Sequence, residues 1–233
     1  MKKDIIGVYF DWFGTLVDSR YTLTNIWSRI ANKLGKNITS DDPRILEGMQ
    51  KQLEEYVKQN KLYINLSEED WYPLNRIVLD TIGVKSQGTN KIISEEFERE
   101  FRTGETYRLY PGCRKTLKEI KSRNIKIGLH THASTEVCQK KMKKWDILKF
   151  FDVFIHAQDF GYNKTHIEFY QIALGAMAPN DPDKIFHVGD DLDLDVKMAQ
   201  KIGMIPILFD PYNIYTLDIV RVIHELPEIL KFL

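Results

Sequence analysis

The spacing of apolar residues divides the chain into two kinds of segment. From Asp18 to about Thr103, apolar residues recur every three or four positions with charged residues between them. This is the spacing of amphipathic helices that pack on one another, so the segment is predicted to be all-helical. The expected stripes are Ile26, Ile30 and Leu34; Leu46, Met49, Leu53 and Val57; Leu74, Ile77, Val78 and Ile82; and a last helix from about Ser94 to Arg102.

The rest of the chain alternates short apolar runs with helical stripes. Strands are expected at residues 5–10, 125–129, 153–155, 185–188 and 205–209, and the helices between the later strands at 137–145, 169–177 and 196–202. Strands that alternate with helices of this size predict an α/β fold with a doubly wound, Rossmann-like parallel sheet. The helical segment is then an insertion, so residues 1–18 and 104–233 form the core and residues 19–103 an all-helical cap domain.

Polar residues stand where four of these strands end. Asp11 follows the first strand, and Gly14-Thr15 turns the chain just beyond it. Thr131 follows the second strand, Lys164 lies a little beyond the third, and Asp190 follows the fourth. Because the carboxyl ends of parallel strands meet at one edge of a sheet, where such folds bind their ligands, these side chains are expected to form one site.

Each of these polar residues also has a plain structural interpretation. Asp11 alone could cap a turn, and Lys164 alone could be a surface lysine. Asp190 and Asp191 could cap the helix that begins near Asp193. Several histidines fall near the same edge, and we expect them to be hydrogen-bonded or solvent-facing rather than metal ligands. They are His130, His156, His166 and His187.

Composition excludes several classes of function. Thirty-three basic residues balance thirty-three acidic ones, so no net field favours nucleic acid or an anionic membrane. The basic run Lys140–Lys144 is expected to be a solvated helix face. Cys113 and Cys138 give neither a disulfide framework nor a zinc spacing, as in a reduced cytoplasmic protein. The first apolar run is too short for a signal peptide, and no stretch has the length of a membrane span.

The segment Asp11-Trp12-Phe13-Gly14-Thr15-Leu16 resembles the nucleophile motif of the haloacid dehalogenase-like hydrolases, Asp-x-Asp-Gly-Thr-Leu. Thr131, Lys164 and Asp190 match the three later motifs in order and separation. The resemblance implies that Asp11 is the nucleophile, that Thr131 and Lys164 bind phosphate, and that Asp190 is a metal ligand. It further implies a Mg²⁺ ion held by Asp11, the backbone carbonyl of Phe13 and Asp190.

The resemblance also suggests roles for the neighbours of these residues. Asp195 is expected to hydrogen-bond Lys164 rather than only to stabilise the first turn of its helix, and Asp191 to support the metal ligands. His132 stands where relatives often have Asn and is expected near the substrate. Trp12 could form a wall of the substrate pocket or only pack under the cap.

Phe13 departs from the motif, because phosphatases of the family have there the acid that protonates the leaving group. We expect a magnesium-dependent, phosphatase-type hydrolase acting on a small phosphorylated metabolite, with low or altered activity. Two other reactions stay open. The 2-haloacid dehalogenases carry Asp-x-Tyr-Gly-Thr and would take a halogenated acid without a metal. The phosphonoacetaldehyde hydrolases carry Asp-Trp-Ala-Gly-Thr and use a cap lysine; the cap lysines here are Lys33, Lys36, Lys51, Lys58 and Lys61.

A relative that binds a ligand or partner protein without turnover is the remaining alternative. Magnesium binding without catalysis would indicate it. No oligomeric state follows from the sequence.

Overall fold

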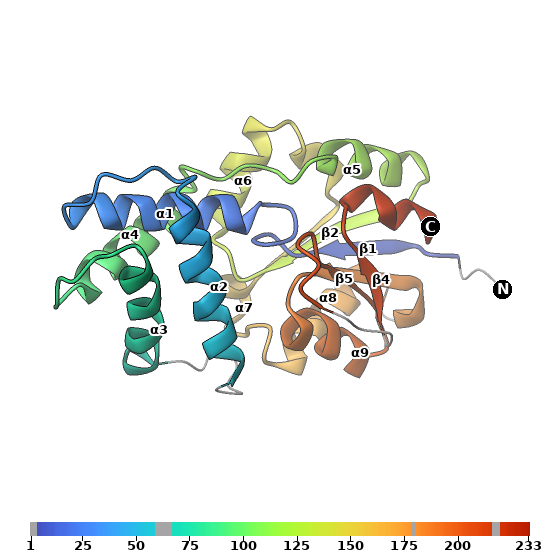
Figure 1. Ribbon diagram of the computed structural model, residues 1–233. Coiled ribbons are helices and arrows are strands. Elements are labelled where there is room, and N and C mark those ends of the chain that lie inside the picture. Colours follow the sequence, from blue (N-terminus) through green and yellow to red (C-terminus); the bar gives the residue numbers. More distant parts are fainter. Residues whose placement is uncertain (1–3, 59–66, 179, 216–219) are drawn as a thin grey trace. The chain divides into compact units, whose positions relative to one another are not determined.

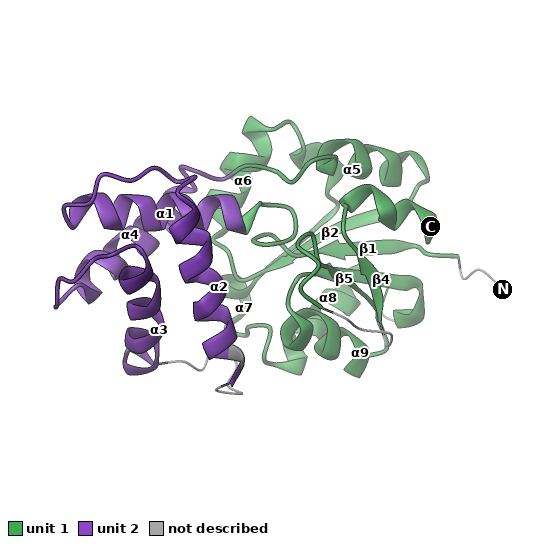
Figure 2. Cartoon of the chain, viewed as in Figure 1, with its two compact units in different colours: residues 1–19, 108–233 green, residues 20–107 purple. Residues whose placement is uncertain are grey.

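The computed structural model describes residues 4–58, 67–178, 180–215 and 220–233. The chain forms two compact units (Figure 2). The first consists of Met1–Ser19 and Arg108–Leu233, and the second of Arg20–Tyr107. The second unit therefore ends a few residues later than the cap expected from the sequence.

A six-stranded, all-parallel sheet is the centre of the first unit (Figure 1). Its strands are β1 (Gly7–Phe10), β2 (Lys126–Thr131), β3 (Val153–His156), β4 (Ile185–Gly189), β5 (Ile205–Phe209) and β6 (Arg221–Ile223). They lie in the order β3-β2-β1-β4-β5-β6, and β1 is buried along its whole length. The predicted doubly wound α/β fold is confirmed, because strands covered on both faces are apolar throughout.

Helices cover both faces of this sheet. Figure 1 shows α5 (Cys113–Ser122) and α6 (Thr135–Lys144) on one face, and α8 (Ile167–Met177) and α9 (Met198–Lys201) on the other. The short α7 (Ala157–Phe160) follows β3. Within the described part of the chain, no helix combines the length and the apolar character that crossing a bilayer requires.

Some boundaries differ from the sequence expectations. The helix expected at 196–202 begins earlier, with a π-helical turn at Leu192–Lys197 that Asp191 caps. Strand β6 was not expected, because three residues at a sheet edge, with Arg221 exposed, carry no apolar run. In the second unit the last helix starts at Asn90 rather than Ser94, and its first turn includes the buried Ile93.

Four helices make up the second unit: α1 (Ser19–Lys33), α2 (Pro43–Lys58), α3 (Glu68–Thr81) and α4 (Asn90–Thr103). Ser67 caps α3, because its hydroxyl accepts from the backbone N–H of Asp70 while the Asp70 carboxylate accepts from the Ser67 N–H. The predicted stripe of α2 is partly wrong: Leu46 and Leu53 are exposed, because the face of α2 that meets α3 runs through Ile45 and Gly48. The helices pack around a core of their own. It consists of Ile26, Trp27, Ile30, Ala31, Ile38, Ile45, Val78, Leu79, Ile82, Val84 and Ile93.

Candidate active site

The loop that follows β1 holds Asp11 in place. The Asp11 N–H donates to the Val188 carbonyl of β4 at 2.9 Å, so the backbone stays in the sheet up to this residue. The chain then turns back, because the N–H groups of Leu16 and Val17 both donate to the Trp12 carbonyl. The turn passes through Gly14 at φ +90°, a conformation that L-residues rarely adopt. The Asp11 carboxylate is thereby fixed at the carboxyl edge of the sheet, only 8% exposed.

Lys164 lies between two carboxylates. Its Nζ is 2.7 Å from Oδ1 of Asp11 and 2.6 Å from Oδ1 of Asp195. Burial alone would lower the pKa of Lys164, but the two carboxylates outweigh burial and raise its pKa above the usual range. Lys164 therefore remains protonated and can bind an anion.

Hydrogen bonds hold the loop around Lys164 in place. The Asn163 side chain accepts from the Thr165 N–H at 2.9 Å, which turns the backbone in the manner typical of Asn. The Lys164 N–H donates to Nε2 of His132 at 2.7 Å. No proline is needed at position 165 to hold this turn.

Asp190 approaches the turn after β1 closely. Its Oδ1 accepts from the Thr15 hydroxyl at 3.2 Å. A Cβ atom added at Gly14 would lie 2.1 Å from Oδ2 of Asp190, so only glycine leaves room for this carboxylate. Burial raises the pKa of Asp190 well above its usual range, and the negative charges of Asp11 and Asp195 add to the effect.

Three carboxylates, those of Asp11, Asp190 and Asp195, offer oxygen atoms within 4.8 Å of one another. They face a single buried ammonium group, so the cluster carries an excess of negative charge. Burial, together with the neighbouring charge of Asp11, raises the pKa of Asp195 to about 7, although Lys164 acts in the opposite direction. Hard oxygen donors with uncompensated charge are what Mg²⁺ prefers, so this donor set fits a magnesium ion.

The side chains of Asp195 and Asp191 bind different groups. Asp195 pairs with Lys164, as expected, and its Oδ2 accepts from the Asp191 N–H at 3.2 Å. Gly189 makes room for it, because a Cβ there would lie 2.0 Å from Cγ of Asp195. The Asp191 side chain instead caps the next helical turn, accepting from the N–H groups of Asp193 and Leu194 at 2.8 Å each.

Thr131 and His132 end strand β2. The Thr131 side chain is 2% exposed, and its oxygen accepts from the Ala133 N–H at 3.1 Å, which leaves the hydroxyl hydrogen available to a ligand. His132 is exposed as a residue, yet burial of its ring and the Lys164 charge lower its pKa to about 4. The imidazole is therefore neutral at pH 7, with its proton on Nδ1.

Trp12 is fully buried and stacks on Trp145, with ring centroids 5.8 Å apart. Its indole N–H has no hydrogen-bond partner among the described residues. These contacts favour packing over a pocket wall.

Sequence reasoning missed two features of this site. Thr15 was given only a role in turning the chain, although its hydroxyl contacts Asp190. His130 and His187 were identified near the site, but nothing in their spacing indicates that Nδ1 of His130 lies 2.9 Å from Nε2 of His187.

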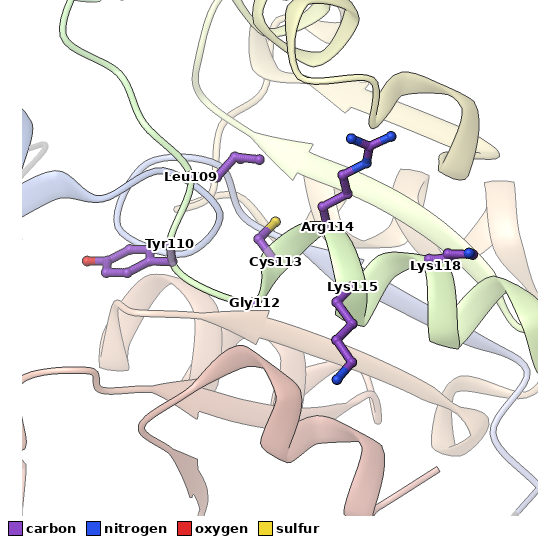
Figure 3. A pocket seen from close by; sticks show the side chains of 7 residues that line it. All are labelled: Leu109, Tyr110, Gly112, Cys113, Arg114, Lys115 and Lys118. Atoms are coloured by element: carbon purple, nitrogen blue, oxygen red, sulfur yellow. The ribbon is translucent and has the colours of Figure 1, made fainter.

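A hollow of about 600 Å³ is lined by the loop that leads into α5 and by the first turns of that helix. Figure 3 shows its lining side chains, with Arg114 and Lys115 pointing to different sides. None of the expected site residues lines this hollow.

The comparisons with known proteins agree with this geometry. The family model described as haloacid dehalogenase-like hydrolase matches residues 7–203. Glyceraldehyde 3-phosphate phosphatase of Methanocaldococcus jannaschii is 33% identical over 134 residues, which cover 53% of this chain and 57% of that protein. Phosphorylated carbohydrates phosphatase of Thermotoga maritima is 26% identical over 200 residues, which cover 85% of this chain and 82% of that protein. The chain thus spans little more than half of the first of these relatives and most of the second.

Solved structures share the fold. A magnesium-bound hydrolase of the same superfamily from Bacillus subtilis has a TM-score of 0.72 at 15% identity, with 98% of both chains covered. A dehalogenase has a TM-score of 0.65 at 18% identity, covering 99% of this chain and 98% of that one. Because the family model covers most of its length, the chain belongs to the haloacid dehalogenase-like hydrolases.

Proposed function

We propose that the chain is a magnesium-dependent phosphatase that uses Asp11 as nucleophile on a small phosphorylated metabolite, a phosphorylated carbohydrate in the first instance. The observation that carries the proposal is the cluster of Asp11, Asp190 and Asp195 around Lys164. A phosphate dianion would be repelled by this cluster, so a divalent cation is required for it to bind. The names of the relatives support a phosphorylated sugar as substrate.

Each residue then has a role in the transfer. An oxygen of Asp11 attacks phosphorus, the bond to the leaving oxygen breaks, and water later hydrolyses the aspartyl phosphate. Lys164 and the Thr131 hydroxyl hold the phosphoryl oxygens as charge develops on them. Asp11, the Phe13 carbonyl and Asp190 would hold Mg²⁺, which offsets the repulsion between nucleophile and phosphate.

No acid stands at the position of Phe13. A proton donor at this point contributes roughly a hundred- to ten-thousand-fold in related chemistry. His132 does not replace it at neutral pH, because its pKa of about 4 leaves the ring neutral. We therefore expect the leaving group to depart without protonation.

The experiment compares two leaving groups. With Mg²⁺, nitrophenyl phosphate should be hydrolysed far faster than an alkyl phosphate, since a nitrophenolate needs no proton and an alkoxide does. Phe13→Asp should raise the alkyl rate by up to roughly a hundred-fold and narrow the gap. Asp11→Asn is the matched control and should abolish turnover in both backgrounds.

Other outcomes would contradict the proposal. Equal rates on alkyl and aryl esters would mean that another residue supplies the proton. His166 would then be the first to replace, because the His132 ring is neutral at pH 7. Halide release from a 2-haloacid without magnesium would establish the dehalogenase alternative instead. Magnesium binding with no turnover of any ester would indicate a binding protein.

The phosphonoacetaldehyde alternative has less support, because it needs a desolvated lysine in the helical unit. Lys33, Lys51 and Lys58 are all exposed and paired with glutamates. Lys36 is half-buried, and Lys61 lies outside the described residues. We propose instead that the helical unit, Arg20–Tyr107, is a cap that selects the substrate.

A further inference from the structure

Two histidines that the proposed chemistry does not use lie fully buried in the sheet beside the site. His130 belongs to β2 and His187 to β4, the two strands that flank β1. His187 pairs in register with Tyr9, and His130 lies one residue beyond the pair of Phe10 and Leu129. Because side chains alternate along strands, both rings lie on the face of the sheet that carries Tyr9.

The two rings contact each other and an aromatic wall. Nδ1 of His130 is 2.9 Å from Nε2 of His187. The His130 ring stacks on Phe169 at 4.2 Å between centroids, and Tyr170 meets both rings edge-on or tilted. Burial lowers the pKa of both imidazoles well below the usual range, so each ring is neutral and carries one proton.

The contact between Nδ1 of His130 and Nε2 of His187 holds one hydrogen, which either ring can donate, so two arrangements of the protons are possible. In the first, His130 donates from Nδ1, so the His187 proton stays on Nδ1, which lies 4.0 Å from Oδ1 of Asp195. In the second, His187 donates from Nε2, and the His130 proton sits on Nε2, which has no hydrogen-bond partner among the described residues. The two arrangements therefore place the remaining N–H group at opposite ends of the pair, in the first 4.0 Å from the Asp195 carboxylate and in the second on a nitrogen with no hydrogen-bond partner in the described structure.

The charge of Asp195 favours the first arrangement. The dipole of the His187 N–H, 4.0 Å from Oδ1 of Asp195, is attracted by the negative charge of that carboxylate. The second arrangement would also turn the lone pair of His187 Nδ1 toward that carboxylate, and a buried environment strengthens the repulsion. Neither His187 Nδ1 nor His130 Nε2 has another hydrogen-bond partner in the described structure.

We propose that His187, held in its Nδ1-protonated tautomer by His130, positions the carboxylate of Asp195 and, through it, Lys164. The oxygen of Asp195 nearest to His187 is Oδ1, and the same oxygen accepts from Lys164 at 2.6 Å. At 4.0 Å the His187 N–H acts as an oriented dipole rather than a hydrogen-bond donor. His187 is thus a positioning residue. Its tautomer can be tested without the proposed function, whereas its effect on turnover rests on that function.

The tautomers can be measured directly on the wild-type protein. Two-bond ¹⁵N–¹H correlation spectra of ¹⁵N-histidine-labelled protein assign the protonated nitrogen of each ring. We expect His130 and His187 both to be protonated at Nδ1, with Nε2 bare. A proton on Nε2 of either ring would overturn the inference.

Activity toward nitrophenyl phosphate tests the positioning role. His187→Leu should lower kcat/KM about tenfold, the usual effect of removing a group that orients an active-site residue. His187→Asn should restore most of the loss, because its amide can place an N–H near the Nδ1 position. Tyr9→Phe is the matched control. It removes the hydroxyl that donates to the Ala173 carbonyl at 2.7 Å in the same core, and it should lower Tm with kcat/KM unchanged.

The outcomes separate this inference from the proposed function. Wild-type kcat/KM in His187→Leu, or an equal loss in Tyr9→Phe, would overturn the positioning role. Should His187→Leu not fold, an inactive His187→Asn that folds with wild-type Tm would overturn it as well. A wild-type protein that turns over no phosphate ester would contradict the proposed function, and the tautomer measurement would still decide the arrangement of the two rings.

Discussion

At the residue scale, the site depends on how closely carboxylates can approach one another. Asp11, Asp190 and Asp195 come from two segments far apart in the chain, the turn after β1 and the residues after β4, and Lys164 compensates only part of their charge. Two glycines permit the approach, since any side chain at Gly14 or Gly189 would collide with a carboxylate. A buried group of like charges is costly without a cation, which is why magnesium should bind here.

Gly14→Ala should weaken Mg²⁺ binding at least about tenfold, a scale typical of disturbed ligand support. The new methyl group would meet the Asp190 carboxylate at 2.1 Å and displace it. Titration calorimetry with Mg²⁺ measures the effect, and Asp190→Asn should weaken binding comparably.

Gly35→Ala is the matched control for this change. Gly35 also has a positive φ, +81°, but a Cβ there would meet nothing within 4 Å. Gly35→Ala should lose about 1 kcal/mol of unfolding free energy from its positive φ, Gly14→Ala at least as much, and only Gly14→Ala should lose metal affinity. Unchanged Mg²⁺ binding in Gly14→Ala would argue against Asp190 as a ligand.

At the element scale, strand ends and capped turns place the functional groups. β1, β2 and β4 end at the same edge of the sheet and deliver Asp11, Thr131 and Asp190. Tight turns then aim the side chains, as the Asp191 cap does after β4. The C-terminal turn Leu226–Lys231 begins with a capping box of Glu225 and Glu228, in which the Glu228 carboxylate accepts from the N–H groups of His224 and Glu225.

Glu228 provides a pH-dependent contribution to this last turn. Hydrogen bonds from Lys231 and from the His224 N–H lower the pKa of Glu228 from 4.5 to about 2. Because the folded pKa lies below the unfolded one, the stabilisation is complete above about pH 4.5 and is lost as the pH falls toward 2. Glu228→Gln should cost about 1 kcal/mol at pH 7, after allowance for solvent screening.

Urea unfolding from pH 7 down to pH 3 measures this difference. The gap between wild type and Glu228→Gln should stay constant to about pH 5 and shrink below it. Glu119→Gln, which breaks an exposed pair with Arg123, should cost less than about 0.5 kcal/mol at pH 7. A difference in unfolding free energy that does not change with pH would mean that the charge of Glu228 does not contribute to stability.

At the scale of the whole molecule, the chain leaves and re-enters the first unit at one place. The Asp18 N–H donates to the Arg108 carbonyl at 3.0 Å, and Val17 bridges Leu109. Arg108 also pairs with the Asp18 carboxylate at 2.7 Å, and the Tyr212 hydroxyl donates to the same carboxylate. Each unit has an apolar cluster built from its own residues.

Replacing residues 20–107 by a short Gly-Ser linker should leave the first unit folded. The ends to be joined already lie within hydrogen-bonding distance, so a short loop closes them at little entropic cost. Circular dichroism and urea unfolding should show one cooperative transition. A shortened chain that stays unfolded, while the full chain folds, would mean that the two units are not independent.

Much of the fold was predictable from local patterns. The five apolar runs and most helical stripes between Asp18 and Thr103 were identified correctly, because burial on two sides or on one face imposes a period on the sequence. The stripe of α2 was placed wrongly, since Leu46 and Leu53 are exposed. The start of α3 was predictable too, since Ser67 and Asp70 cap one another. Strand β6 was not, because an edge strand of three residues has too few buried positions to leave a pattern.

The sequence by itself determined the family, the parallel sheet and the four polar strand ends. These depend on local periods and on the order of motifs along the chain. Only the tertiary structure decided which groups meet: Lys164 between Asp11 and Asp195, Thr15 on Asp190, and the two buried histidines. The physical reason is that these contacts join residues many positions apart, so they depend on strand order and helix packing, which no local pattern records.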